Sequence, residues 1–341
     1  DRTGYVRADV TGKWGGFTGQ LNVTTGGAGD FRIAAAYTWP GLSQAAVNLA
    51  SGTSLYMSGT LNSGAGTFIS IGTLAGAAGS HLRGGPTGDR TLTYRIGGRG
   101  GDAVFSGNIT EQNTSTATNI IKQGPGVWSL GGSCTHRGQT VVEAGTLCLL
   151  ATGSLVNTSS LDVRAGATLC LDGGLVNVES LTIGEGAFFT CSGGSVTADL
   201  SNSGILSVTG GTLQLTGDVT NTGTLRVSGG AALQVSGVFT NNGLLDLLTG
   251  VSGLPSEFVN NGVVVLNTDR KVLTAVRDPA SLTLTVRGYE GHTYQLQHAP
   301  DLAGPWTDIG PARPGAGEVL EFSATGNLAD AKGYYRVAAS P

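Results

Sequence analysis

The chain has 341 residues and a formal net charge of −4, and only 12% of its residues are charged. This charge gives no sign of a nucleic-acid partner, which clustered basic residues would attract. Glycine is abundant at 58 residues, but the absence of a Gly-X-Y period excludes collagen, and 39% hydrophobic residues exclude a disordered glycine-rich tract.

Two further features bear on location. No apolar run reaches the roughly 18 residues of a membrane-spanning helix, so we expect no membrane span. The chain begins Asp1-Arg2, with neither a methionine nor a signal peptide, which is typical of a mature or trimmed product.

Residues 1–105 are rich in glycine and strand-forming residues but show no strict period, so we expect irregular, wider or longer coils of a solenoid. They contain the densest cationic stretch of the chain, with two acidic residues among its members: His81, Arg83, Arg90, Arg95 and Arg99, with Asp89 and Asp102. Lyases that act on acidic sugars place arginine or lysine beside carboxylates. Gly-Gly turns surround these charges, however, which favours solvated turns.

Residues 97–105, GGRGGDAVF, fit the nonapeptide GGxGxDxUx of calcium-binding β-rolls. Calcium in such rolls lies between successive turns, which requires tandem copies, and the sequence holds one copy. We therefore expect no calcium here, and we predict no metal and no cofactor elsewhere.

Residues 106–266 contain an internal repeat of about 20 residues, which decides the fold class. Residues 211–230 and 231–250 are identical at eight of twenty positions. The identical pairs include Leu213 and Leu233, Gln214 and Gln234, and Asn221 and Asn241. Asn202 precedes this series and Asn260 continues it, and glycines at 204, 223, 243 and 262 follow the asparagines.

Short alternating segments within each repeat predict strands with one buried face. Such a unit cannot bury its apolar face alone, and stacking on the next unit about 4.8 Å away solves this. The result is a parallel β-solenoid of about six regular coils, with Gly-Gly and Asn-x-Gly turns that we expect to use positive φ. Its predicted ladders are Leu213 and Leu233 inside, Gln214 and Gln234, and a polar ladder of Asn221, Asn241 and Asn260. An antiparallel meander of hairpins is the alternative, because Asn-Asn-Gly can close a hairpin.

Four cysteines fall in this region. Cys148 and Cys170 occupy matching places one coil apart, within the Cα range of a disulfide, although two stacked free thiols are the alternative. Cys191 matches Leu171 and is expected to be inward and inert. Cys134 lies in a turn-prone stretch and either pairs or stays free.

Residues 267–341 lose the repeat, and charge rises at residues 269–271. Alternating Leu282, Leu284 and Val286 predict a small antiparallel β-sandwich-like domain. We expect five residues in its core, with a sugar-stacking surface as the alternative: Tyr294, Leu296, Trp306, Tyr334 and Tyr335.

Nothing in the sequence predicts an enzyme. His136, His292 and His298 form no metal-binding motif, and neither a nucleophile elbow nor a phosphate-binding loop is present. The carboxylates considered as catalytic groups are scattered among turns: Glu143, Asp162, Asp172 and Glu185.

Residues 119–149 carry a more specific pattern at positions that include Gly124, Gly126, Gly132 and residues 144–147. The stretch resembles the autotransporter-associated β-strand repeat, close to LTKTGxGTLTLSGANTYTGGTTVNAGTLxL, although Cys134 replaces the usual Asn and His136 the usual Tyr. Residues 14–24 and 103–109 look like other coils of such proteins. The segments around Tyr294, Trp306 and Tyr334 look like a terminal domain of secreted proteins from Verrucomicrobia and Planctomycetes.

This resemblance implies an all-β, right-handed parallel β-helix exported to the cell surface or medium, and it implies no chemistry. We expect an extracellular structural protein whose partner is another copy of itself, forming a filament or layer, because weakly charged solenoid ends pair with other chains. An adhesin that binds surface glycans is one alternative, and a polysaccharide lyase or hydrolase is a second.

Overall fold

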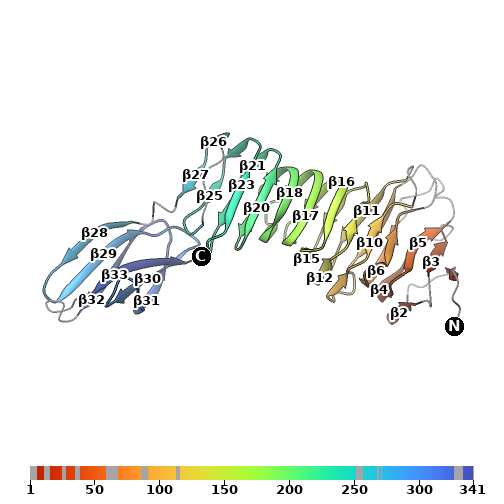
Figure 1. The fold of residues 1–341 in the computed structure, drawn as a ribbon, viewed down its shortest axis with the longest axis horizontal. Coiled ribbons are helices and arrows are strands. Elements are labelled where there is room, and N and C mark those ends of the chain that lie inside the picture. The colour runs from red at the N-terminus through yellow and green to blue at the C-terminus, as the bar shows by residue number, and fades with distance from the viewer. Residues whose placement is uncertain are drawn as a thin grey trace.

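A computed structural model describes residues 6–10, 16–24, 28–34, 39–58, 68–85, 91–112, 116–250, 256–266, 269, 271–325 and 333–340. The fold is all-β, with a parallel β-solenoid of about 10 turns followed by two small antiparallel sheets (Figure 1). The expected fold class is therefore confirmed, and the hairpin meander is excluded because strands of successive coils pair in parallel.

Three parallel ladders, named A, B and C here, form the sides of the solenoid. Ladder A contains β1 (Val6–Val10), β3 (Gly29–Ala34), β5 (Thr53–Ser58), β7 (His81–Arg83), β10 (Asn108–Thr110), β13 (Ser133–Cys134), β20 (Thr212–Thr216) and β23 (Ala232–Val235). Ladder B contains β2 (Gln20–Val23), β9 (Ala103–Phe105), β12 (Val127–Leu130), β15 (Thr146–Leu150), β19 (Ile205–Val208), β22 (Thr224–Val227), β25 (Leu244–Asp246) and β27 (Val263–Val265). Ladder C contains β8 (Leu92–Ile96), β11 (Thr118–Lys122), β14 (Thr140–Val142), β21 (Val219–Asn221), β24 (Phe239–Asn241) and β26 (Phe258–Asn260).

Five longer strands bend around corners and contribute to more than one ladder. They are β4 (Trp39–Leu49), β6 (Phe68–Gly76), β16 (Ser154–Val163), β17 (Thr168–Ile183) and β18 (Phe188–Asn202).

The coils shorten along the chain. Gln20 pairs with Ala46 in an early coil, and Tyr94 pairs with Ile120 at the same separation in sequence. On its other side Ile120 pairs with Thr140, which is clearly nearer in sequence. Longer N-terminal coils were expected, and the shortening falls about one coil later than the expected boundary at residues 105 and 106.

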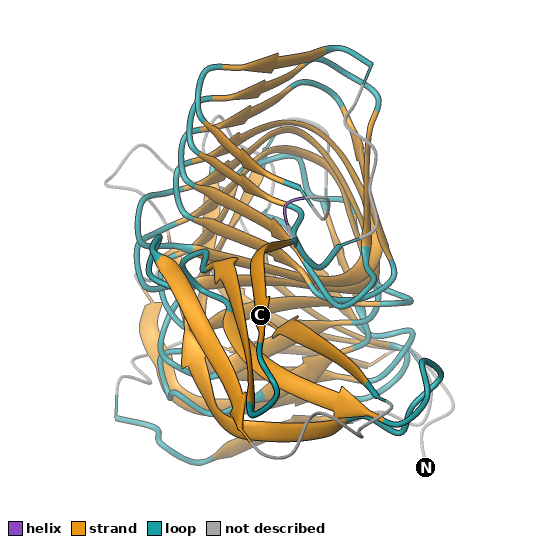
Figure 2. Cartoon of the chain, turned by 90° about the vertical axis from the view of Figure 1, so that its left-hand side faces the viewer, coloured by secondary structure: helices purple, strands orange, loops and turns teal. Residues whose placement is uncertain are grey.

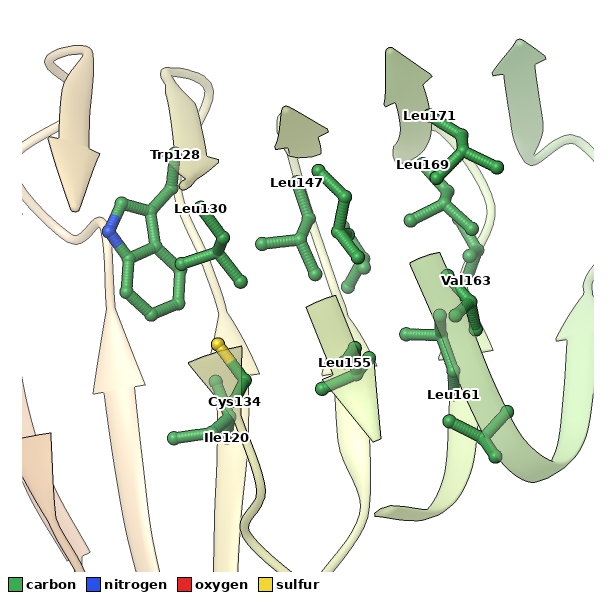
Figure 3. Packing of buried hydrophobic residues seen from close by; sticks show 14 of the residues in the cluster. Ile120, Trp128, Leu130, Cys134, Leu147, Leu155, Leu161, Val163, Leu169 and Leu171 are labelled. Atoms are coloured by element: carbon green, nitrogen blue, oxygen red, sulfur yellow. The ribbon is translucent and has the colours of Figure 1, made fainter. Parts of the chain in front are cut away.

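One continuous apolar core fills the solenoid from Val23 to Leu247. Inward side chains stack from coil to coil, as Leu147 does on Leu169 (Figure 3). The predicted inward ladder is present, since Leu213 and Leu233 are buried and lie side by side in ladder A.

Glycine turns the chain for two different reasons. Gly229 and Gly230 have φ of 63° and 79°, which agrees with the expected positive φ of Gly-Gly turns. The expectation of positive φ was wrong for the glycines of the Asn-x-Gly turns. A Cβ on Gly243 would collide with the carbonyl oxygen of Gly223, and one on Gly262 with that of Gly243. Close stacking of the turns, not backbone conformation, therefore requires these glycines.

The C-terminal domain consists of two three-stranded antiparallel sheets. One holds β28 (Val272–Arg277), β29 (Ser281–Arg287) and β32 (Val319–Thr325), and the other holds β30 (Thr293–Ala299), β31 (Thr307–Pro314) and β33 (Tyr334–Ser340). Leu282, Leu284 and Val286 alternate into a shared core as predicted.

Candidate functional site

The asparagines of the last four coils form a continuous amide ladder inside the solenoid. Asn202 Nδ2 donates to Asn221 Oδ1 at 2.7 Å, and the same bond joins Asn221 to Asn241 and Asn241 to Asn260 at 2.8 Å. Each of the three donors also reaches a backbone carbonyl of the next coil, such as Leu244 O at 3.0 Å. The predicted ladder thus exists, and it satisfies carbonyls that would otherwise be buried without a partner.

The two ends of this ladder differ. Asn202 Oδ1 is buried without a hydrogen-bond partner, because the residue stacked before it is Ile183. Asn260 is exposed, and among the described residues its amide donates only to Gly262 O at 3.2 Å. The amide donors of the ladder therefore point toward the C-terminal end of the solenoid, where the last one faces outward.

The last coil has an open edge. Among the described residues, β26 pairs only with β24, and β27 only with β25. Val259 of β26 and Val263 of β27 are 48% and 59% exposed. Unpaired edge strands that carry apolar side chains readily pair with another chain.

The C-terminal domain packs on one part of this coil. Val265 of β27 and Leu248 are buried in the same cluster as Leu284 and Tyr294 of the domain. In Figures 1 and 2, the upper part of the terminal coil, which carries β26, projects clear of the domain. The domain therefore covers the ladder B side of the end and leaves the ladder C side open.

A buried ionic contact fixes this junction. Asp246 of β25 accepts from Arg226 Nε at 2.8 Å and contacts His292 Nε2 at 2.7 Å, and both Asp246 and His292 are buried. Burial alone would raise the pKa of Asp246, but hydrogen bonds from His292, Arg226 and the Leu248 N–H together hold that pKa below its usual value.

A cavity of about 210 Å³ lies beside this contact, and its wall joins solenoid and domain. Leu248 contributes from the solenoid, while Tyr289, Tyr294 and Tyr335 contribute from the domain. The sequence did not predict this junction. The matching positions of Arg226 and Asp246 in successive repeats could have indicated their pairing, but no periodicity relates His292 to either.

A buried lysine occupies an equivalent corner further upstream. Lys122 lies on the same line of ladder C positions as the asparagines, between Ile96 and Val142. Its Nζ donates to Gln123 O, Gly124 O and Ala144 O at 3.1, 2.8 and 2.9 Å. Burial lowers the pKa of Lys122 to about 8. Lys122 was not among the predicted site residues, although a lysine in phase with inward apolar residues is a sequence signal for such a buried position.

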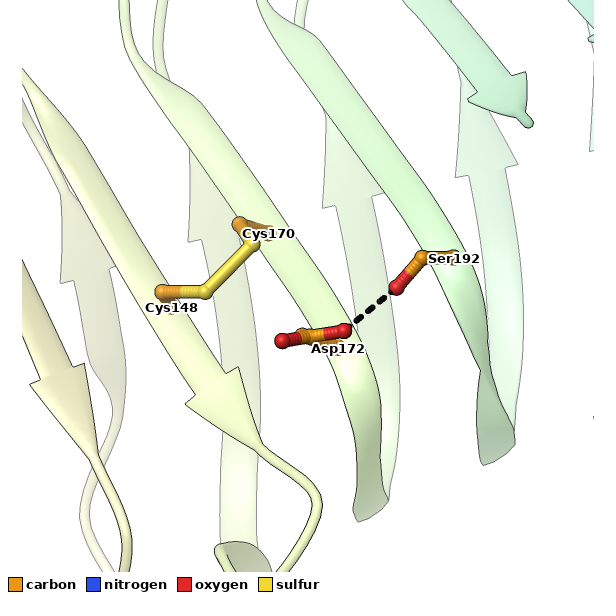
Figure 4. Close-up of a disulfide and its surroundings, with 4 residues drawn as sticks. All are labelled: Cys148, Cys170, Asp172 and Ser192. Atoms are coloured by element: carbon orange, nitrogen blue, oxygen red, sulfur yellow. Dashed lines mark hydrogen bonds between the residues drawn. A yellow bond between two sulfur atoms is a disulfide. The ribbon is translucent and has the colours of Figure 1, made fainter. Parts of the chain in front are cut away.

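The structure joins Cys148 and Cys170 by a disulfide between β15 and β17, with a Cα–Cα distance of 4.3 Å (Figure 4). Cys191 lies beside Leu171 and is buried, as expected, and Cys134 is a buried free thiol. Burial raises the pKa of Cys134 to about 12 and that of Cys191 to about 11, which makes both thiols unreactive.

Gln214 and Gln234 lie side by side in ladder A with exposed side chains. They therefore continue the coil-to-coil register on the outer surface, in line with the predicted ladder.

The described members of the cationic stretch lie on different sides of the coil. His81 and Arg83 lie on β7 in ladder A, whereas Arg95 lies on β8 in ladder C and contacts the Phe68 ring at 5.2 Å. Arg99 donates to Thr18 O at 3.1 Å. Arg90 and Asp89 lie outside the described residues. The basic residues that the structure describes are thus spread around the coil.

The calcium motif and the carboxylates have structural surroundings. Asp102 Oδ1 accepts from Val127 N at 2.7 Å, and Asp172 accepts from Ser192 Oγ at 2.6 Å. Glu143, Asp162 and Glu185 lie on other turns and strands. Within the described ranges, no three His, Cys, Asp or Glu side chains gather closely enough to hold a metal ion.

The predicted core of the C-terminal domain is partly wrong. Tyr294 and Leu296 are buried, and Tyr335 packs against the core with its ring tilted against that of His298. Tyr334, however, is 48% exposed, and Trp306 lies half-buried under Arg336, 4.0 Å from its ring. The alternation of β33 turns the neighbour of Tyr335 outward, so only one of the two tyrosines can reach the core.

The geometry defines a class of protein, a parallel β-solenoid with an attached antiparallel domain. No protein-family model matches the chain, and no curated protein matches it. The part of the chain that the structure describes contains no helix with the length and apolarity of a membrane span.

Proposed function

We propose that this chain is an extracellular structural protein that assembles with copies of itself through the ends of its solenoid. The observation that carries the proposal is the open edge of the last coil, where β26 and β27 have partners on one side only within the described chain. At the other end, the described pairings of β1 and β2 are with β3 and β4 alone. A contact between the two ends is head-to-tail and does not close, so it produces filaments.

The surface chemistry supports the same proposal. Only 12% of the residues are charged, so copies repel one another weakly. Exposed Val259 and Val263 on the edge strands supply apolar area, and the outward amide of Asn260 supplies a donor. The Cys148–Cys170 disulfide supports an extracellular location, because disulfides persist in oxidising compartments.

The test is electron microscopy of the purified chain by negative stain, together with light scattering over a range of concentrations. We expect filaments or open oligomers, and Val259→Lys should abolish them because a charge on an edge strand blocks pairing. Val238→Lys is the matched control, since Val238 is 41% exposed on an internal coil and should leave assembly unchanged. A wild-type chain that stays monomeric at high concentration contradicts the proposal.

A further inference from the structure

The flank of the solenoid carries a hollow of about 520 Å³ at the corner between ladders A and C. Three successive coils form it, and five of its six lining residues are polar. They are Arg137, Asn157, Thr158, Asn177, Val178 and Glu179. Its volume lies within the range of small-ligand sites, and its wall is distant in sequence from the end of the solenoid.

The backbone at this corner adopts an unusual conformation. Val156 pairs with Asn177 and Thr158 with Val178, which leaves Asn157 as the extra residue of a bulge. Asn157 has a φ of 64° and is the one non-glycine residue with positive φ among those described. A glycine would hold this conformation more easily, so the asparagine places an amide on the hollow where the backbone alone does not call for one.

Three of the polar side chains in the hollow lack the partners that such groups have elsewhere, whereas Thr158 Oγ1 donates to His136 O at 3.0 Å and Arg137 Nη2 to Thr116 O at 3.5 Å. On other outer surfaces they pair from coil to coil, as Asn261 does with Asn242 at 2.9 Å. Within the described chain, the side chains of Asn157, Asn177 and Glu179 make no hydrogen bond. Two amides and a carboxylate therefore present unused donors and acceptors to one open space.

The composition of the wall selects the ligand. Arg137 and Glu179 balance in charge, so the hollow attracts neither a phosphate backbone nor an acidic glycan. The wall contains no aromatic ring and Val178 is its one apolar side chain, which disfavours an apolar peptide. Sugar hydroxyls both donate and accept hydrogen bonds, as the exposed amides do. We infer that this hollow binds a short segment of an uncharged oligosaccharide. The inference does not depend on self-assembly.

Isothermal titration of the full chain tests this, with soluble oligosaccharides of glucose, mannose and galactose as probes and a uronic acid oligomer for comparison. The Val259→Lys background keeps assembly from disturbing the titration. We expect at least one neutral probe to bind. Asn177→Ala should raise the Kd for that probe about five- to tenfold, since one hydrogen bond to the ligand is lost.

Asn157→Gly separates a binding role from a turn-forming role, because glycine suits the positive φ while removing the amide. This variant should raise the Kd by a similar factor without lowering Tm. Gln234→Ala, on an exposed position outside the hollow, should leave Kd unchanged. The inference is overturned if no neutral probe binds at millimolar concentration, if only the uronic acid oligomer binds, or if both hollow variants bind as the wild type does.

Discussion

The coils before Ile120 and the coils after it share three ladders but differ in length and in filling. The longer coils and the transition between the two groups enclose Tyr94, Phe105 and Trp128, all fully buried. The shorter coils are filled mainly by leucine, isoleucine and valine, although Phe189 and Phe239 are also fully buried in them. Because protein interiors are close-packed, each coil needs side chains that fill its own cross-section. The two largest buried side chains, Trp128 and Tyr94, lie in the last long coils and at the transition.

The coils also differ at one corner, at the end of ladder C, and there the change falls within the shorter coils, between Ile183 and Asn202. The stacked positions there run Ile71, Ile96, Lys122, Val142, Val163, Ile183, Asn202, Asn221, Asn241 and Asn260. Apolar residues occupy most of the earlier coils, one lysine stands at the transition, and asparagines occupy the last four. The same corner is thus completed either by packing or by hydrogen bonds to carbonyls.

The largest expected effect comes from emptying the wide interior. Trp128→Ala should lower the free energy of unfolding by about 3–5 kcal/mol. It removes a large buried ring and the bond from Nε1 to Leu74 O at 3.0 Å. Urea unfolding measures the loss, and Trp128→Phe is the control that keeps most of the volume. If the alanine variant loses far less than a buried large-to-small change normally costs, the wide coils can collapse around the gap.

The second-largest expected effect is a loss of stability in acid, caused by a histidine in the first short coil. Burial lowers the pKa of His136 to about 4, while its Nε2 contacts Thr140 Oγ1 at 2.8 Å. Well above pH 6.5 the imidazole is neutral in both folded and unfolded chains. As pH falls from 6.5 toward 4, the unfolded chain takes up a proton that the folded chain does not, so stability is lost.

The expected loss between pH 7 and pH 4.5 is about 2–3 kcal/mol. Urea unfolding at the two pH values measures it, and His136→Gln should remove most of the difference. The lowered pKa of Asp246 makes its own contribution disappear only as pH falls through more acidic values. An equal loss in wild type and variant would assign the acid sensitivity to other groups.

Breaking the amide ladder tests the corner directly. Asn221→Val should cost about 2 kcal/mol, because it removes the amide that donates to Asn241 Oδ1 and Leu244 O and leaves one N–H of Asn202 Nδ2 without its acceptor. Replacing Asn202, Asn221 and Asn241 together by valine should cost less than three times that value, since apolar residues complete the corner in earlier coils. Thermal and urea unfolding compare the variants, and strictly additive losses would contradict a cooperative ladder.

The sequence revealed those parts of the structure that repeat. Identical residues at matching places in successive repeats put Leu213 on Leu233 and Asn221 on Asn241, and the matching TLCL segments brought Cys148 to Cys170. Once the period is known, stacking follows from geometry. The wide coils lack such identity, so their strands and their end at Ile120 could be anticipated only in outline.

Features formed between segments that do not occupy matching places in the repeat were not predicted. Asp246 meets His292, which belongs to the other domain and to no matching place in a repeat. The hollow depends on a bulge at Asn157, and alternation patterns do not indicate where a strand gains a residue. Tyr334 and Tyr335 are chemically alike, and only the register of β33 determines which of them lies outside.

The smallest expected effect concerns the lysine at the transition between the two groups of coils. Burial lowers the pKa of Lys122 to about 8, against about 10.5 in the unfolded chain. Between these values the unfolded chain holds a proton that the folded chain has released. Stability should therefore rise with pH, by about 1–2 kcal/mol from pH 8 to pH 9.5.

Lys122→Met keeps the approximate length of the side chain but removes the titrating group. The rise in stability with pH should therefore vanish. Any change in overall stability reflects the three carbonyls that lose Nζ as their donor. Lys271→Met is the control, because Lys271 is exposed and its variant should keep the rise. Urea unfolding at closely spaced pH values provides the measurement. If the rise in stability with pH persists in Lys122→Met, the ammonium of Lys122 is not the group whose burial opposes folding. The ladder C corner would then tolerate a charge as readily as it tolerates the asparagine amides.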